Sequence, residues 1–212
     1  MTCKSSAAAL LILVMATVSF PAAAAPRLEV KPRTVIASGA TPNGDVVFFA
    51  VLNRPTGIYS TLARVTEIVK ADAQGTAVLN VDLDVPRRSL WFAVDVLRGE
   101  FVAAAPAGFS VRAASRPLHA LRRGEASQGD SLQFSGGTAD MLVVRRGGGV
   151  WALRASKGGS RDVGHDPHLL VVGLQQFQSL TDRTPGPDRL KAGDLVIAVD
   201  TDTLRYSAET VN

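Results

Sequence analysis

The stretch Ser89-Leu90-Trp91-Phe92-Ala93-Val94-Asp95-Val96 decides the fold, and a shorter version of it, Ile197-Ala198-Val199-Asp200, returns near the C-terminus. Apolar residues at 90, 92, 94 and 96 alternate with Trp91, Ala93 and Asp95, which is the period of two that a β-strand requires. We therefore predict a central strand with the Phe92 face buried in a core. The Trp91 face also carries a charge, and we expect it at a contact between two units or in an exposed recognition patch.

Residues 1–25 have the pattern of a secretory signal peptide. Lys4 precedes an apolar run from Ala7 to Val18, and Pro21 then leads into small alanines, with cleavage expected after Ala24. The run is shorter than the roughly 20 apolar residues that span a bilayer, and no longer run follows it. We expect a secreted or periplasmic protein whose mature chain has no transmembrane segment.

The mature chain has neither cysteine nor a strongly basic character. The only cysteine, Cys3, lies in the predicted signal peptide, so no disulfide is available and the core alone must stabilise the fold. Removal of Lys4 lowers the formal net charge from +4 by one, to +3. Basic and acidic residues are interleaved along the chain, which argues against nucleic acid as a partner.

Alternating apolar residues and turn-forming residues predict a first β unit over residues 26–114. Residues 28–31 and 35–37 suggest one strand interrupted at Pro32, and residues 46–52 are apolar on both faces. Residues 61–69 fit a helical stripe, but their β-branched side chains favour a strand. Further strands are predicted at residues 76–85 and 109–112.

The turns of this first unit resemble those of bacterial immunoglobulin-like modules from secreted and surface proteins. The similarity lies in Ser38-Gly39 through Gly44-Asp45-Val46-Val47 and in Ala71-Asp72-Ala73-Gln74-Gly75-Thr76, and it covers residues 27–114. The cysteine pair and core tryptophan of antibody domains are not at the expected spacing. The resemblance implies a β-sandwich used for binding or spacing, and it implies no catalytic residues.

A linker at residues 115–130 and a second β unit at residues 131–212 complete the predicted organisation. Three stretches of the second unit follow the pattern of the first: Asp140-Met141-Leu142-Val143-Val144 corresponds to Asp45-Val46-Val47-Phe48-Phe49, Gly149-Val150-Trp151 to Gly57-Ile58-Tyr59, and residues 169–174 to residues 77–82. Divergent duplication and the ordinary patterning of all-β chains both account for this similarity. The predicted fold is all-β, with two tandem sandwich-like units.

One loop offers metal-ligating side chains. Asp162, His165 and His168 could supply three ligands to zinc, which makes a metal-binding protein or a metal-dependent enzyme the alternative function. Lys157 and Arg161 oppose a cation there, so we interpret the loop as a polar turn. The sequence contains neither a Gly-x-Ser-x-Gly motif nor a phosphate-binding loop, and we expect no catalytic activity and no cofactor.

Aromatic and basic residues provide the candidate binding positions. Trp91, Trp151 and Tyr59 could stack on a ligand, although such residues also pack in cores. The arginine pairs Arg87-Arg88 and Arg145-Arg146 lie at predicted turns or strand ends, where they protect edges or capture an anionic polysaccharide. We therefore expect an exported, non-catalytic binding or structural module, whose partner is a surface protein or an anionic polysaccharide.

Overall fold

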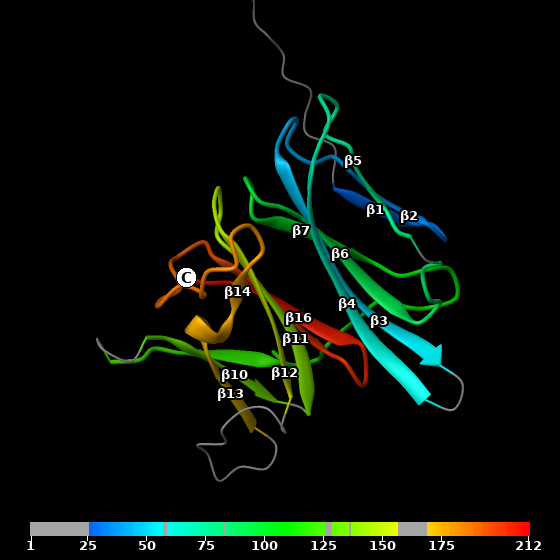
Figure 1. Ribbon diagram of the computed structural model, residues 1–212. Coiled ribbons are helices and arrows are strands. Elements are labelled where there is room, and N and C mark those ends of the chain that lie inside the picture. The colour runs from blue at the N-terminus through cyan, green and yellow to red at the C-terminus, as the bar shows by residue number, and fades with distance from the viewer. Residues whose placement is uncertain (1–25, 57–58, 83, 126–128, 136, 157–168) are drawn as a thin grey trace, which may run out of the picture.

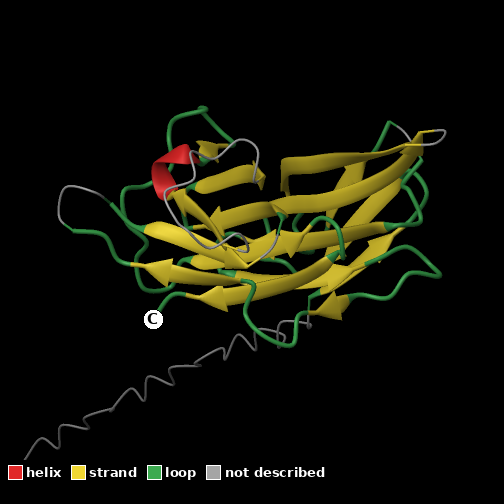
Figure 2. Ribbon diagram, turned by 90° about the horizontal axis from the view of Figure 1, so that it is seen from below, coloured by secondary structure: helices red, strands yellow, loops and turns green. Residues whose placement is uncertain are grey.

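The computed structural model describes residues 26–212 except 57–58, 83, 126–128, 136 and 157–168 (Figure 1). Strands dominate this part of the chain and form four sheets, which we call A (order β1-β2-β5), B (β4-β3-β6-β7), C (β14-β12-β11-β15-β16-β8) and D (β13-β10-β9). A 3-10 turn, η1 (Leu174–Gln176), is the helical ribbon in Figure 2. The predicted all-β class is confirmed. Within these residues, no helix is long and apolar enough to cross a membrane.

The N-terminal half of the chain builds sheets A and B. Its strands are β1 (Arg27–Val30), β2 (Thr34–Ser38), β3 (Asp45–Thr56), β4 (Tyr59–Lys70), β5 (Ala77–Asn80), β6 (Ser89–Asp95) and β7 (Glu100–Ala104). The ambiguous segment at residues 61–69 is a strand, as predicted. Pro32 does not interrupt a single strand, because β1 and β2 pair antiparallel and Pro32 lies in the hairpin between them.

The C-terminal half builds sheets C and D. Its strands are β8 (Arg112–Ala113), β9 (His119–Arg122), β10 (Ser131–Ser135), β11 (Thr138–Val144), β12 (Val150–Ser156), β13 (Leu169–Gly173), β14 (Gln178–Ser179), β15 (Leu195–Asp200) and β16 (Arg205–Thr210). Two predictions fail here. The strand expected at residues 109–112 does not complete the first half, because β8 pairs in parallel with β16 of sheet C. The expected linker at 115–130 contains β9, which pairs with β10.

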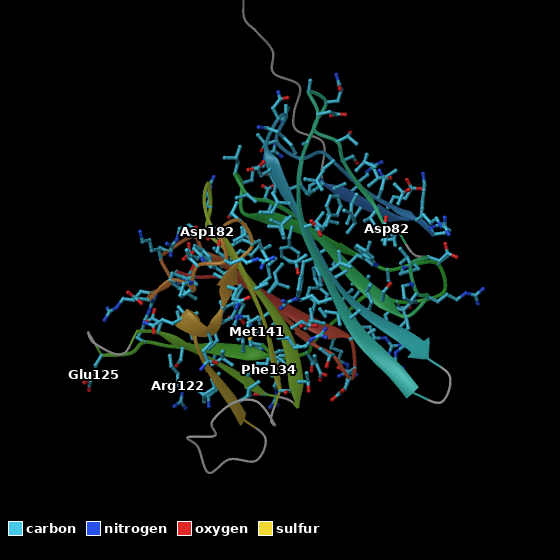
Figure 3. The ribbon with its side chains drawn as sticks, in the orientation of Figure 1. Asp82, Arg122, Glu125, Phe134, Met141 and Asp182 are labelled. Carbon is cyan, nitrogen blue, oxygen red and sulfur yellow. The ribbon has the colours of Figure 1, made fainter. Side chains whose placement is uncertain are left out.

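The four sheets stack in the order A, B, C, D, with an apolar core between each neighbouring pair. Val35 of β2, Phe48 of β3 and Trp91 of β6 belong to the core between sheets A and B. Phe134 of β10 and Met141 of β11, which are labelled in Figure 3, belong to the core between sheets C and D. The third core lies between sheets B and C and joins the two halves of the chain, for example through Phe92 and Ile197.

Strand β6 is buried on both faces, and the roles of these faces are the reverse of our prediction. The residues at 90, 92, 94 and 96 contact the other half of the chain through the core between sheets B and C. Trp91 is 0% exposed inside the core between sheets A and B, so the expected exposed patch or inter-unit position is wrong. Its indole Nε1 donates to Ser89 Oγ at 3.0 Å, which satisfies the buried N–H group. Phe92, rather than Trp91, lies at the contact between the halves.

The two halves share a strand order. Sheet A, in the order β1-β2-β5, corresponds to β9-β10-β13 of sheet D, and sheet B corresponds to β12-β11-β15-β16 of sheet C. The turns after β6 and β15 also agree: Asp95 Oδ1 accepts from the backbone N–H groups of residues 97 and 98, and Asp200 Oδ1 accepts from those of residues 202 and 203. Four residues after each aspartate the backbone has a positive φ, at Gly99 and at Leu204.

Alignment on these two turns shifts the correspondence predicted from the sequence. Asp95 of β6 pairs with Val46 of β3, and Asp200 of β15 pairs with Ala139 of β11, so Ala139 corresponds to Val46. The next residue, Asp140, therefore corresponds to Val47. The predicted match of Asp45 with Asp140 is therefore wrong by two residues. Because the side chains of a strand alternate with a period of two, this shift leaves the faces unchanged.

Candidate functional site

A cavity of about 320 Å³ opens between β9 of sheet D and β16 of sheet C. Its apolar lining comes from Leu121, Leu132, Val196 and Val211, and its polar lining from His119, Arg123, Glu209, Thr210 and Asn212. This volume is at the lower end of the range for small-ligand sites, and an apolar floor with a few polar groups is their usual lining. We take this cavity as a candidate binding site because it combines an apolar floor with a buried histidine and a carboxylate.

His119 is the buried polar residue of this cavity, with 5% of its surface exposed. Its Nδ1 lies 3.1 Å from Ser207 Oγ, and its Nε2 lies 3.7 Å from Glu209 Oε2. Burial lowers the pKa of the imidazole, and the Glu209 carboxylate raises it in part. The net pKa is below the ordinary value of 6.5, so the ring is neutral at physiological pH.

Ser207 and Glu209 lie two residues apart on β16 and therefore on one face of the strand. Besides its contact with His119, Ser207 Oγ accepts a hydrogen bond of 3.0 Å from the Leu118 backbone N–H group. These contacts hold the segment between β8 and β9, residues 114–118, against sheet C. The serine hydroxyl thus has internal partners, whereas 46% of the Glu209 side chain is accessible at the cavity.

A second hollow of about 310 Å³ lies beside this segment. Phe101 of β7 lines it together with residues 113–117 and residues 206–209. Phe101 and Tyr206 meet there edge to face, with ring centroids 6.3 Å apart. Glu209 lines both spaces, so the two hollows follow one strand, β16.

The outer edge of β16 is open beside the cavity. Strand β8 pairs only with Arg205 and Tyr206, and no other described strand pairs with that edge. Val211 exchanges backbone hydrogen bonds with residues 193 and 194, toward β15. Because backbone groups alternate in direction along an antiparallel strand, those of Ala208 and Thr210 point away from β15, toward the open edge.

The predicted aromatic residues do not form one ligand surface. Trp91 is fully buried, as described above. Trp151 of β12 is half-buried, and the Arg145 guanidinium lies 5.3 Å from the centroid of its ring. The Tyr59 backbone belongs to β4, and its side chain lies outside the described part of the structure.

The predicted arginine pairs lie at opposite ends of the contact between sheets B and C. At one end, Arg88 Nη2 donates to the Asp202 carbonyl at 3.1 Å, and Arg87 is exposed. At the other end, Arg146 Nε donates to the Leu97 carbonyl at 3.2 Å, and Arg145 binds the buried Asp194 carboxylate. Arg88 and Arg146 therefore connect the two halves, and the two pairs do not converge on one basic face.

The predicted metal ligands Asp162, His165 and His168 lie outside the described residues. Among residues that the structure does describe, no cluster of three or more metal-ligating side chains occurs.

Sequence reasoning did not find His119, Ser207 or Glu209. His119 stands in a stretch whose composition indicated a linker, and no local pattern connects it to residues almost 90 positions later. The only available signal was the alternation Ser207-Ala208-Glu209 in a strand that follows an apolar strand.

Comparison of the chain with models of known protein families and with curated proteins found no match.

Proposed function

We propose that the protein is an exported, non-catalytic binding module that holds an extended segment of a surface protein along β16. The observation that carries this proposal is the cavity between β9 and β16 beside an open strand edge. An added strand gains affinity from main-chain hydrogen bonds and specificity from a pocket that accepts alternate side chains. Here the groups of Ala208 and Thr210 would supply the hydrogen bonds, and the apolar floor of the cavity would accept one side chain.

Export and the immunoglobulin-like character are part of the same proposal. Residues 1–25 support export through their signal-peptide pattern. A three-stranded sheet packed on a four-stranded antiparallel one supports the immunoglobulin-like character, because seven strands in two sheets are typical of such sandwiches. Cell fractionation followed by intact-mass measurement of the exported chain tests the first point, with cleavage expected after Ala24.

Binding is tested with a phage-displayed library of random dodecapeptides, panned against the mature protein. The enriched peptides are then measured on Leu121→Trp, which narrows the cavity, and on Val171→Trp, which places the same bulk on a residue of sheet D that is 38% exposed and does not line the cavity. We expect Val171→Trp to bind like the wild type and Leu121→Trp to bind at least about tenfold more weakly, a loss of 1.4 kcal/mol. Equal binding by both variants, or no enrichment of peptides, contradicts the proposal.

A further inference from the structure

The open edge of β16 lies between two hollows, one on each face of sheet C. Leu121 and Leu132 of sheet D line the cavity described above, and Phe101 of sheet B lines the second hollow. Sheets B and D pack on opposite faces of sheet C, so the two hollows open on opposite sides of the same strand edge. Because side chains alternate between the faces of a strand, a segment added to this edge would present side chains to both hollows.

The two hollows are offset along the strand. Residues 209–212 line the cavity, and residues 206–209 line the second hollow. Val211 packs toward sheet D and Ala208 toward sheet B. Opposite residues of two paired strands share a face, so a side chain opposite Val211 would enter the cavity and one opposite Ala208 would enter the second hollow. Phe101 lines the second hollow and apolar side chains line the cavity, so both positions suit a large apolar side chain.

Glu209 lies between these two positions and shares its face of the strand with Val211. Its side chain is 46% accessible, and the imidazole 3.7 Å away is the neutral ring of His119. The cavity is also lined by Arg123, but its Nη1 already donates to the buried Asp130 carboxylate at 2.6 Å. Opposite charges on directly opposed residues of paired strands attract, so the residue opposite Glu209 should be basic.

The open backbone groups of Ala208 and Thr210 fix the register of these positions. We propose that the partner segment carries the pattern apolar-x-basic-apolar if it runs antiparallel to β16, or the reverse, apolar-basic-x-apolar, if it runs parallel. Arg116 lines the second hollow and disfavours a basic side chain there, which agrees with an apolar residue opposite Ala208. This inference rests on the proposed function and specifies which surface-protein segments the module accepts.

Two fluorescently labelled peptides test the pattern by anisotropy titration of the mature protein. One contains Ser-Thr-Leu-Thr-Lys-Leu-Thr-Ser, and the other contains the same residues in reverse order, so that the tighter binder reports the direction of the added strand. In derivatives of that peptide, serine replaces either leucine or glutamine replaces the lysine. We expect each leucine replacement to weaken binding at least about tenfold. Loss of the lysine should weaken it by about two- to fivefold, the range of a cross-strand charge pair.

Three protein variants assign each peptide position to its site. Leu121→Trp narrows the cavity, Ala113→Trp narrows the second hollow at an exposed residue, and Glu209→Gln removes the carboxylate. Each variant should weaken the parent peptide, and each should be insensitive to replacement of the one peptide residue that it no longer accommodates. Val171→Trp, on an exposed residue that lines neither hollow, is the matched control and should bind all peptides like the wild type. The peptide replacements are measured on the wild-type protein and therefore do not depend on the folding of any variant.

The outcomes separate this inference from the proposed function. If panned peptides lack the pattern but still lose affinity for Leu121→Trp, the module binds extended segments and the pattern is wrong. The pattern is also wrong if neither designed peptide binds, or if binding is indifferent to the lysine and to Ala113→Trp. If panning enriches no peptide and neither designed peptide binds, the proposed function and this inference fail together.

Discussion

Truncation of Phe92 should destabilise both halves of the molecule. Its side chain is 0% exposed in the core between sheets B and C. Ring centroids of Phe49, Phe101 and Tyr206 lie 5.7, 6.4 and 5.1 Å from its own, and Tyr206 comes from the C-terminal half. Phe92→Ala therefore removes a fully buried ring together with contacts to both halves, and we expect a cost of about 3 to 5 kcal/mol.

Urea unfolding of the full mature chain measures this effect. With a urea dependence of about 2 to 3 kcal/mol per M, the midpoint should fall by about 1 to 2.5 M. The two tryptophans report on different sheets: Trp91 lies in the core between sheets A and B, and Trp151 belongs to sheet C. Each can be followed alone after replacement of the other by Phe.

In both single-tryptophan backgrounds, Phe92→Ala should lower the unfolding midpoint, because the halves share the core that contains Phe92. Val171→Ala, at a position that is 38% exposed, serves as the control and should leave both midpoints unchanged. If Phe92→Ala shifts the Trp91 transition while the Trp151 transition stays in place, the halves are independent and the shared core does not stabilise the C-terminal half.

His119 should make stability depend on pH. Because its folded pKa is below the unfolded value of 6.5, its contribution is fully present above about pH 6.5 and is lost as the pH falls through the folded pKa. Melting temperatures measured from about pH 7.5 down to 5 should fall less steeply for His119→Gln than for the wild type, and identical slopes would refute the buried neutral imidazole. Gly75→Ala should cost more stability than Gly108→Ala, as measured by urea unfolding. Both backbones have a positive φ, but only at Gly75 would the added Cβ meet backbone, 2.2 Å from the Ala40 carbonyl oxygen; equal costs would contradict the clash.

The period of two in Ser89–Val96 was sufficient to predict a strand, but not to assign its faces. Trp91 and Asp95 suggested a wet face because both carry polar atoms. In the structure those atoms have internal partners: Ser89 accepts from the indole, and the N–H groups of the following turn donate to Asp95. Both faces of β6 are therefore buried, and only the packing of four sheets decides which face contacts the other half.

The candidate site was harder to predict than the strands, because it depends on contacts between distant residues. Strand β9 has four residues, and its pairing with β10 spans a polar loop whose composition resembles a linker. His119 meets Ser207 and Glu209 only because sheets C and D pack together. The arginine pairs were visible in the sequence, but their separation to opposite ends of the B–C contact follows from the topology.

The central claim, that the cavity along β16 binds an extended peptide segment, is tested most directly by methyl NMR. The mature protein, labelled at its Leu and Val methyl groups, is titrated with the peptide that panning enriches most. The account predicts shifts concentrated at the cavity residues Leu121, Leu132, Val196 and Val211, with the exposed Val78 of sheet A unchanged. Shifts centred on Val78 or on the core between sheets A and B, with the cavity methyl groups unmoved, would contradict it.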